Sequence, residues 1–173
     1  RCFYALEQNR ADQKRYPAVN PIDSYSKYLE YPEIREYLNE TIMPGWVEMV
    51  ERAKNIVRKG KEANDQINIL GDDGVPMSYH EIFWKSELVD FVILQQDAFD
   101  DIDALCPLER QSYMLELVLG ICEQEFTFED YEQCRNFFKE VINILRQMNY
   151  SEFKSEKFEN YKQQLTNLLS NGN

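Results

Sequence analysis

The chain has 173 residues, of which 43% are hydrophobic and 13% aromatic, so it can bury a core as one domain. Its formal net charge is -12, with 31 acidic and 19 basic side chains before the single His is counted. This acidity argues against a nucleic-acid-binding surface and against adsorption to an anionic membrane. The sequence also lacks an apolar run of the ~18 residues that a membrane-spanning helix needs, so we expect no direct insertion into a membrane.

The cysteines and the histidine do not have the spacing of a metal site. Cys2, Cys106, Cys122 and Cys134 form no CxxC pair, and His80 is the only histidine. Zinc needs several convergent ligands at short spacing, so we expect no metal in this chain. Cys122 and Cys134 fall on apolar helix faces, so packing in the core is their simplest interpretation, and reduced thiols fit a cytoplasmic protein.

The first 25 residues predict an extended strap. The run Arg15–Tyr28 reads RYPAVNPIDSYSKY. Pro17 and Pro21 fix φ at two points and bias the residues before them towards extended geometry. This predicts a stiff, non-helical segment that displays Tyr16.

Helices are expected from there on. Pro32 can occupy the first turn of a short helix. Apolar side chains recur at helical spacing over 46–70, and the Gly–Pro-rich run 71–76 then ends that helix. The next helix, roughly 79–96, is apolar nearly all round and should be the most buried; Ser78 and Glu81 predict a capping box at its start.

Further helices are predicted after Pro107, after the Thr127–Asp130 segment, and after Ser151 or Ser155. No part of the sequence alternates with a sustained period of two, so no substantial sheet is expected. The prediction is an all-α bundle of about five to six helices over 26–173, preceded by the strap over 1–25.

Three motifs resemble the catalytic subunits of rotary ATPases, in the same order. YPAVN with SYS in the strap is similar to FPAIN followed by SYS in the catalytic A subunits of the V/A type. LQQDAFDDIDALCPL over Leu94–Leu108 resembles LQQNAFDPVDTYCSL, and INILG over Ile67–Gly71 resembles IIAILG of the F-type beta subunit. On these motifs the chain is identified as a member of the family of V/A-type catalytic A subunits, with a resemblance that covers roughly its whole length.

The resemblance implies the C-terminal helical domain of a protein that makes or hydrolyses ATP with Mg²⁺, coupled to proton or sodium transport. The sequence has no G-x-x-x-x-G-K-[ST] motif to hold phosphates. We therefore expect no catalytic residue and no bound cofactor in this chain, and a nucleotide domain upstream of Arg1. The implied partners are the B subunit and the central stalk, in a hexamer of A and B subunits, which is cytoplasmic and attached to the membrane through the assembled complex.

The resemblance also implies an adenine-binding site formed by Tyr16, Pro17, Ala18, Phe99 and Leu105. In the family the aromatic before Pro stacks on adenine, and an aromatic at the position of Phe99 belongs to the same pocket. Leu105 stands where the family often has Tyr, which weakens the second wall. From the residues alone, Tyr16 is better explained as a half-buried residue that packs on the bundle, and only the resemblance favours the adenine role. Phe99 is equally explained as an anchor of its loop in the core.

The resemblance implies a contact with the rotor stalk at the turn after Gly71. Asp72, Asp73, Val75 and Met77 are the candidate contact residues; a solvated turn is the alternative.

Four aspartates at 97, 100, 101 and 103 lack the ligand order of an EF-hand, so no calcium site is expected.

A different class of function also fits the acidic helical pattern: a free-standing adaptor that binds partner helices in a groove.

Overall fold

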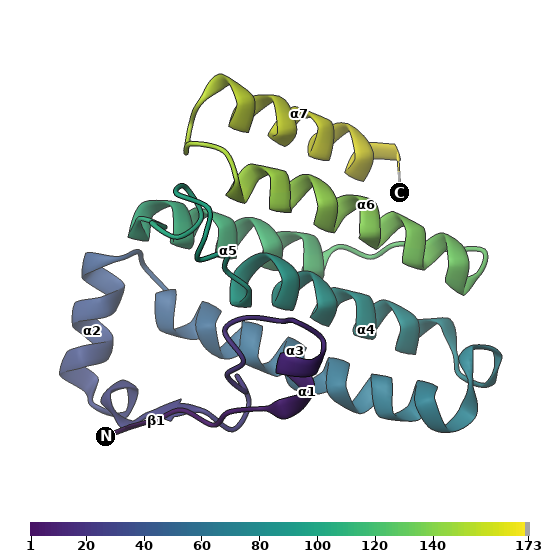
Figure 1. The fold of residues 1–173 in the computed structure, drawn as a ribbon, viewed down its shortest axis with the longest axis horizontal. Helices are drawn as coiled ribbons and strands as arrows, with labels where there is room; N and C mark the ends of the chain where they lie inside the picture. The colour runs from purple at the N-terminus through teal and green to yellow at the C-terminus, as the bar shows by residue number, and fades with distance from the viewer. Residues whose placement is uncertain (172–173) are drawn as a thin grey trace.

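Seven α-helices form most of the structure, a computed structural model that describes residues 1–171 (Figure 1). The last two residues of the predicted bundle, 172 and 173, lie outside the described part. The helices are α1 (Gln8–Asp12), α2 (Pro32–Thr41), α3 (Trp46–Leu70), α4 (Met77–Val89), α5 (Leu108–Glu123), α6 (Tyr131–Asn149) and α7 (Glu156–Asn171). The prediction of an all-α bundle preceded by a short N-terminal piece is confirmed.

The helices of the bundle pack side by side. In Figure 1, α7 lies at one side against α6, α4 and α5 follow, and α3 lies at the opposite side of the row. The largest fully buried apolar side chains come mainly from α4 to α7, including Leu88, Val118, Phe138 and Phe158. The helix α4 packs between α3 and α6. The prediction that it is the most buried helix is wrong, because a larger share of the residues of α5 and α6 is buried.

Several helix ends follow from the sequence. Pro32 occupies the first turn of α2. Gly45 and Gly71 flank α3 with φ of 78° and 81°, a left-handed conformation that favours glycine. The Asp130 side chain accepts a hydrogen bond from the Gln133 amide and caps α6.

The predicted capping box at the start of α4 is wrong. This helix begins at Met77, so Ser78 already lies inside it. Pro76 holds the N-cap position in extended geometry, and no side chain caps the helix there. Glu81 instead pairs with Lys85 one turn later, at 2.6 Å.

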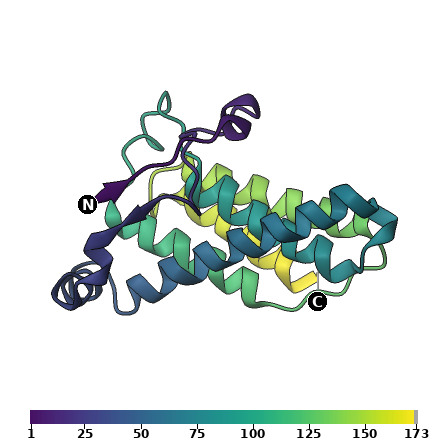
Figure 2. The same ribbon diagram turned by 90° about the horizontal axis from the view of Figure 1, so that it is seen from below.

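The N-terminal strap is a small unit of its own. Strands β1 (Cys2–Phe3) and β2 (Tyr25–Ser26) pair antiparallel, with Cys2 opposite Ser26 and Phe3 opposite Tyr25. Between them, α1 was not predicted from the sequence. Figure 2 shows that the strap and the loop 95–107 project from the same side of the bundle.

The predicted helix 79–96 ends differently from an α-helix. After Val89 it continues as a π-helical segment, Asp90–Leu94, and the Gln95 amide closes it by donating to the Asp90 carbonyl at 3.0 Å. Such segments have a wider turn than an α-helix and are frequent at functional sites. Here the π-helical segment connects helix α4 directly to the loop that carries Phe99.

Candidate functional site

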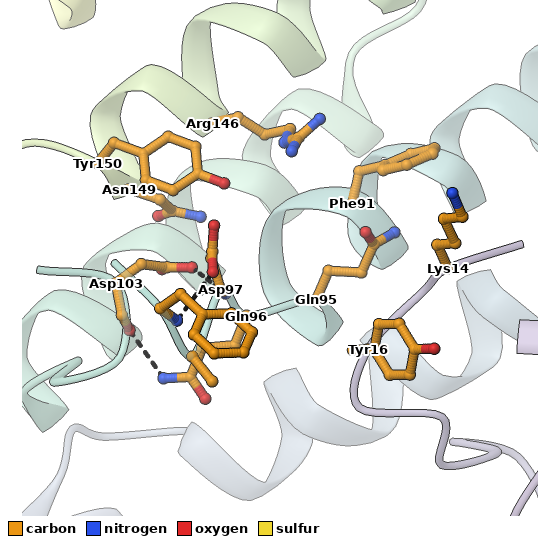
Figure 3. Close-up of a pocket in the computed structure, with 12 residues that line it drawn as sticks. Lys14, Tyr16, Phe91, Gln95, Gln96, Asp97, Asp103, Arg146, Asn149 and Tyr150 are labelled. Carbon is orange, nitrogen blue, oxygen red and sulfur yellow. Dashed lines mark hydrogen bonds between the residues drawn. The ribbon is translucent and has the colours of Figure 1, made fainter. Parts of the chain in front are cut away.

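A cavity of about 490 Å³ opens between the strap, the end of the π-helical segment and the end of α6 (Figure 3). Its size is in the range of small-molecule sites. The cavity is lined by Lys14, Tyr16, Phe91, Gln95, Gln96, Asp97, Ala98, Phe99, Asp103, Arg146, Asn149 and Tyr150. The structure thus brings Tyr16 and Phe99, which are far apart in the sequence, to one cavity.

Tyr16 is presented by the strap. Its side chain is 56% exposed, so at least part of the ring is open to a ligand. The Gln96 amide donates to the Tyr16 carbonyl at 3.1 Å, which ties the strap to the loop after the π-helical segment. The backbone at Tyr16 is therefore fixed against the cavity while the ring remains accessible.

Phe99 is presented by a loop that is closed by its own side chains. The Asp97 amide donates to the Asp103 carboxylate at 2.6 Å, and the Gln96 side chain donates to the Asp103 carbonyl at 2.8 Å. The Phe99 amide donates to the Asp97 carboxylate at 2.9 Å. These bonds hold the loop while leaving the Phe99 side chain 99% exposed, so the interpretation of Phe99 as a core anchor is wrong.

A buried polar network lies next to the cavity and includes two of its lining residues, Asp103 and Asn149. Arg110 is 1% exposed; its guanidinium donates to the Asn149 carbonyl at 3.1 Å and lies 3.6 Å from the Asp103 carboxylate. The Asn149 side chain donates to the Val92 carbonyl at 2.9 Å. Burial raises the pKa of Asp103, an effect that the Asp97 amide and the Arg110 charge only partly offset. The network joins the loop to α5, α6 and the π-helical segment.

The remaining wall carries amide and cationic groups. Gln95 has its side-chain nitrogen buried without a hydrogen-bond partner. Lys14 and Arg146 approach from the strap and from α6 (Figure 3). A flat aromatic ligand with hydrogen-bonding edges matches such a lining, because the rings can stack on it and the amides can bind its edge.

The predicted adenine site included only two of these lining residues, Tyr16 and Phe99. Gln95 and Gln96 belong to the family motif over Leu94–Leu108, so their position shortly before Phe99 was a signal that could have identified them. Lys14 lies within the predicted strap, two residues before Tyr16. Arg146, Asn149 and Tyr150 stand at the end of α6, and nothing in their local sequence indicates that they meet residue 16.

Three of the five predicted adenine-site residues do not line this cavity. Pro17 lines a separate, mostly apolar cavity of about 450 Å³ between the strap and the bundle. The Ala18 carbonyl accepts a hydrogen bond from the Glu7 amide at 3.0 Å, within the strap. Leu105 is 77% exposed and lies outside the lining, so the structure does not support its role as a second wall.

The second predicted site, the turn between α3 and α4, lies at the other end of the bundle from the loop 95–107 (Figures 1 and 2). Asp72 and Asp73 are exposed there, and Val75 is half-buried. Met77 packs against the core instead of projecting. The turn is fixed to the start of α4, because His80 is buried and its Nε2 lies 2.9 Å from the Asp72 carbonyl oxygen.

Within residues 1–171, no group of three or more His, Cys, Asp or Glu side chains is arranged to hold a metal ion. All four cysteines are free thiols. Burial raises the pKa of both Cys122 and Cys134 to about 12, so these two remain protonated at neutral pH. None of the helices in this part of the chain combines the length and the hydropathy needed to cross a bilayer.

The sequence of this chain is similar to a known protein family. Residues 35–133 match the family model described as "C-terminal domain of V and A type ATP synthase". This range includes the loop with Phe99 and the α3–α4 turn, whereas the strap and nearly all of α6 lie outside it.

Curated relatives match nearly the whole chain. The V-type ATP synthase alpha chain of Chlamydia abortus is 36% identical over 167 residues, which is 96% of this chain and 28% of the relative. The alpha chain of Chlamydia trachomatis is 37% identical over the same shares. That of Protochlamydia amoebophila is 36% identical over 90% of this chain and 26% of the relative.

The chain therefore spans about a quarter of the length of these relatives. The family model, in contrast, covers more than half of the chain, and the matched region contains most of α2 and all of α3, α4 and α5. The chain belongs to the family of C-terminal domains of V and A type ATP synthases.

Proposed function

We propose that this chain is the C-terminal domain of the catalytic A subunit of a V/A-type ATP synthase, and that its cavity holds the adenine of bound ATP or ADP. The observation that carries the proposal is the meeting of Tyr16 and Phe99 at one cavity. Both rings are accessible. The Tyr16 carbonyl accepts a hydrogen bond from the Gln96 amide, and the Phe99 amide donates to the Asp97 carboxylate, so both backbones are held.

The sequence indicates which part of the nucleotide this domain binds. It has no G-x-x-x-x-G-K-[ST] loop, so the phosphates and Mg²⁺ bind to another part of the full-length protein. The domain contributes base binding, and this chain alone hydrolyses no ATP. The B subunit and the central stalk are the partners, and the assembled complex attaches the protein to the membrane.

Replacing Tyr16 by Ala in the full-length protein is expected to weaken ATP binding. Stacking on an aromatic contributes roughly 1–3 kcal/mol per base, so the dissociation constant should rise about tenfold or more. The rate of the chemical step should change little, because the reacting phosphates are distant from the base. Titration of wild-type and variant protein with ATP measures the first quantity, and single-turnover hydrolysis measures the second.

The matched control is Tyr37→Ala, because Tyr37 is also an exposed tyrosine, at 61%, but lies on α2 away from the cavity. An unchanged dissociation constant for Tyr16→Ala, or an equal loss for the control, would show that the ring does not hold adenine.

The α3–α4 turn is proposed to contact the central stalk. It is the exposed end of a helical hairpin, and α4 joins it to the π-helical segment beside the cavity. At 1.5 Å per residue, this helix spans about 20 Å and can carry a displacement between the two sites as a rigid element. The acidic side chains Asp72 and Asp73 suit a basic partner surface.

Reversing both charges, with Asp72→Lys and Asp73→Lys, should reduce ion transport per ATP hydrolysed in the assembled complex while nucleotide affinity stays near the wild-type value. Glu36→Lys with Glu40→Lys is the control, since these exposed acids lie on α2 at the other end of the bundle. Simultaneous measurement of proton or sodium uptake and of ATP hydrolysis gives the ratio. A loss of nucleotide binding as large as the loss of transport would contradict a stalk contact.

A further inference from the structure

Four charged side chains form a mutually paired cluster where the strap meets the bundle. The two terminal nitrogens of Arg15 donate to the two Glu87 oxygens at 2.9 and 2.8 Å. Arg15 also donates to Asp90 at 2.5 Å, and Arg10 lies 2.8 Å from the second Asp90 oxygen. We call Arg10, Arg15, Glu87 and Asp90 the ion cluster.

The ion cluster is neutral and largely shielded from water. Its side chains are between 7% and 19% exposed, and two positive charges face two negative ones. Burial disfavours the charged form of Arg15, but Glu87 and Asp90 outweigh it and hold the pKa of Arg15 above its ordinary value. The Arg15 guanidinium also lies over the Phe91 ring, 4.7 Å from its centroid. Removal of one member leaves an uncompensated buried charge, so the members stabilise the cluster as a set.

The ion cluster joins the same two segments that border the cavity, the strap and the π-helical segment with the end of α4. Arg10 and Arg15 belong to the strap, and Arg15 directly precedes Tyr16. Asp90 begins the π-helical segment that ends beside Gln95, and Glu87 lies about one turn earlier on α4. The cluster therefore fixes the distance between the segment that presents Tyr16 and the segment that leads to Phe99.

A backbone hydrogen bond supports Tyr16 at the cavity itself, from the Gln96 amide to the Tyr16 carbonyl. The Arg15 amide donates to the Arg10 carbonyl at 2.7 Å, which folds the strap so that both guanidiniums reach the same carboxylates. A bidentate arginine fixes orientation as well as distance, because its planar fork accepts one geometry of carboxylate.

We propose that the ion cluster is a positioning device for the base of the nucleotide: it holds Tyr16 at the stacking distance from a base in the cavity. Arg15 and Glu87 are its main positioning residues, and they touch no reacting atom. The proposal rests on the proposed function, since it assumes that the cavity binds adenine.

The test uses Glu87→Gln in the full-length protein, because this change keeps the shape of the side chain and removes its charge. The dissociation constant for ATP is expected to rise about threefold or more, with kcat within about twofold of wild type. In a Tyr16→Ala background the same change should add less than about twofold, since residues that act as a unit are not additive. Restoring the charge with Glu87→Asp should recover part of the affinity.

Two controls separate positioning from a general loss of stability. Val141→Ala removes a fully buried core side chain of α6 and should lower the unfolding midpoint without changing the dissociation constant. Trypsin cleavage after Arg10 and Lys14 reports the strap directly, because cleavage requires local opening. It should accelerate in Glu87→Gln and not in Val141→Ala, and equal cleavage rates in wild type and both variants would overturn the proposal.

The outcomes distinguish the two proposals. If Tyr16→Ala weakens ATP binding and Glu87→Gln does not, the ion cluster has no positioning role and the adenine site stands. If Tyr16→Ala has no effect, the adenine site is wrong, and an effect of Glu87→Gln would then also show that the cluster does not act through Tyr16. Full additivity of the two changes would likewise overturn the positioning of Tyr16.

Discussion

Replacing Phe138 by Ala is expected to lower the free energy of unfolding by about 3–5 kcal/mol, the cost typical of truncating a large aromatic in a core. Phe138 is 0% exposed on the buried face of α6. Its ring centroid lies 5.8 Å from that of Phe126, 6.1 Å from that of Phe128 and 5.4 Å from that of Phe137. The cavity left by the substitution would therefore be surrounded by rings that cannot close it by small movements.

Denaturant unfolding of the wild-type and variant chains, followed by circular dichroism, measures this loss. Phe99→Ala is the matched control, since it removes the same ring from a position that is 99% exposed. Its unfolding midpoint should stay near that of the wild type. A loss for Phe138→Ala no larger than that for Phe99→Ala would show that α6 does not pack as described.

Replacing Gly60 by Ala is expected to destabilise the chain by about 1–3 kcal/mol through overpacking. Gly60 is buried in α3, where this helix packs against α4. A Cβ at this position would lie 2.0 Å from the Ser86 Cβ and 2.2 Å from its hydroxyl oxygen. The Ser86 Cβ cannot move without its backbone, so the two helices would have to separate.

Two variants test this explanation by thermal or denaturant unfolding. Gly120→Ala makes the same chemical change in α5, where nothing lies within 4 Å, and should stabilise by about 0.4–1 kcal/mol. Adding Ser86→Gly to Gly60→Ala removes the colliding atoms and should restore most of the lost stability. A neutral Gly60→Ala, or no recovery in the double variant, would contradict the close approach of α3 and α4.

Most of the fold could be predicted because its signals are local. Apolar spacing located α3 and α6, and Pro32 and Asp130 marked helix starts. The errors also have local causes: the Ser78 capping pattern is present in the sequence, but the extended backbone at Pro76 starts the helix earlier. The π-helical segment leaves no periodic trace, because it is a short widening inside an otherwise apolar run.

The site could be predicted only in part because tertiary packing brings together residues that are distant in the sequence. The family motifs identified Tyr16 and Phe99 and placed both in one predicted pocket, and the structure brings both to one cavity. Arg146 and Tyr150 come to the cavity only because α6 packs against the π-helical segment. Arg15 reaches Glu87 across 72 residues of sequence, a separation over which no spacing rule applies.

The position of adenine in a bound complex tests the central claim most directly. The measurement is an experimental structure of the full-length protein in its complex with Mg-ADP. Adenine is expected in the cavity between the strap and the loop 95–107, stacked on the Tyr16 ring and in contact with Phe99. Adenine bound elsewhere, with both rings still exposed to solvent, would contradict the account.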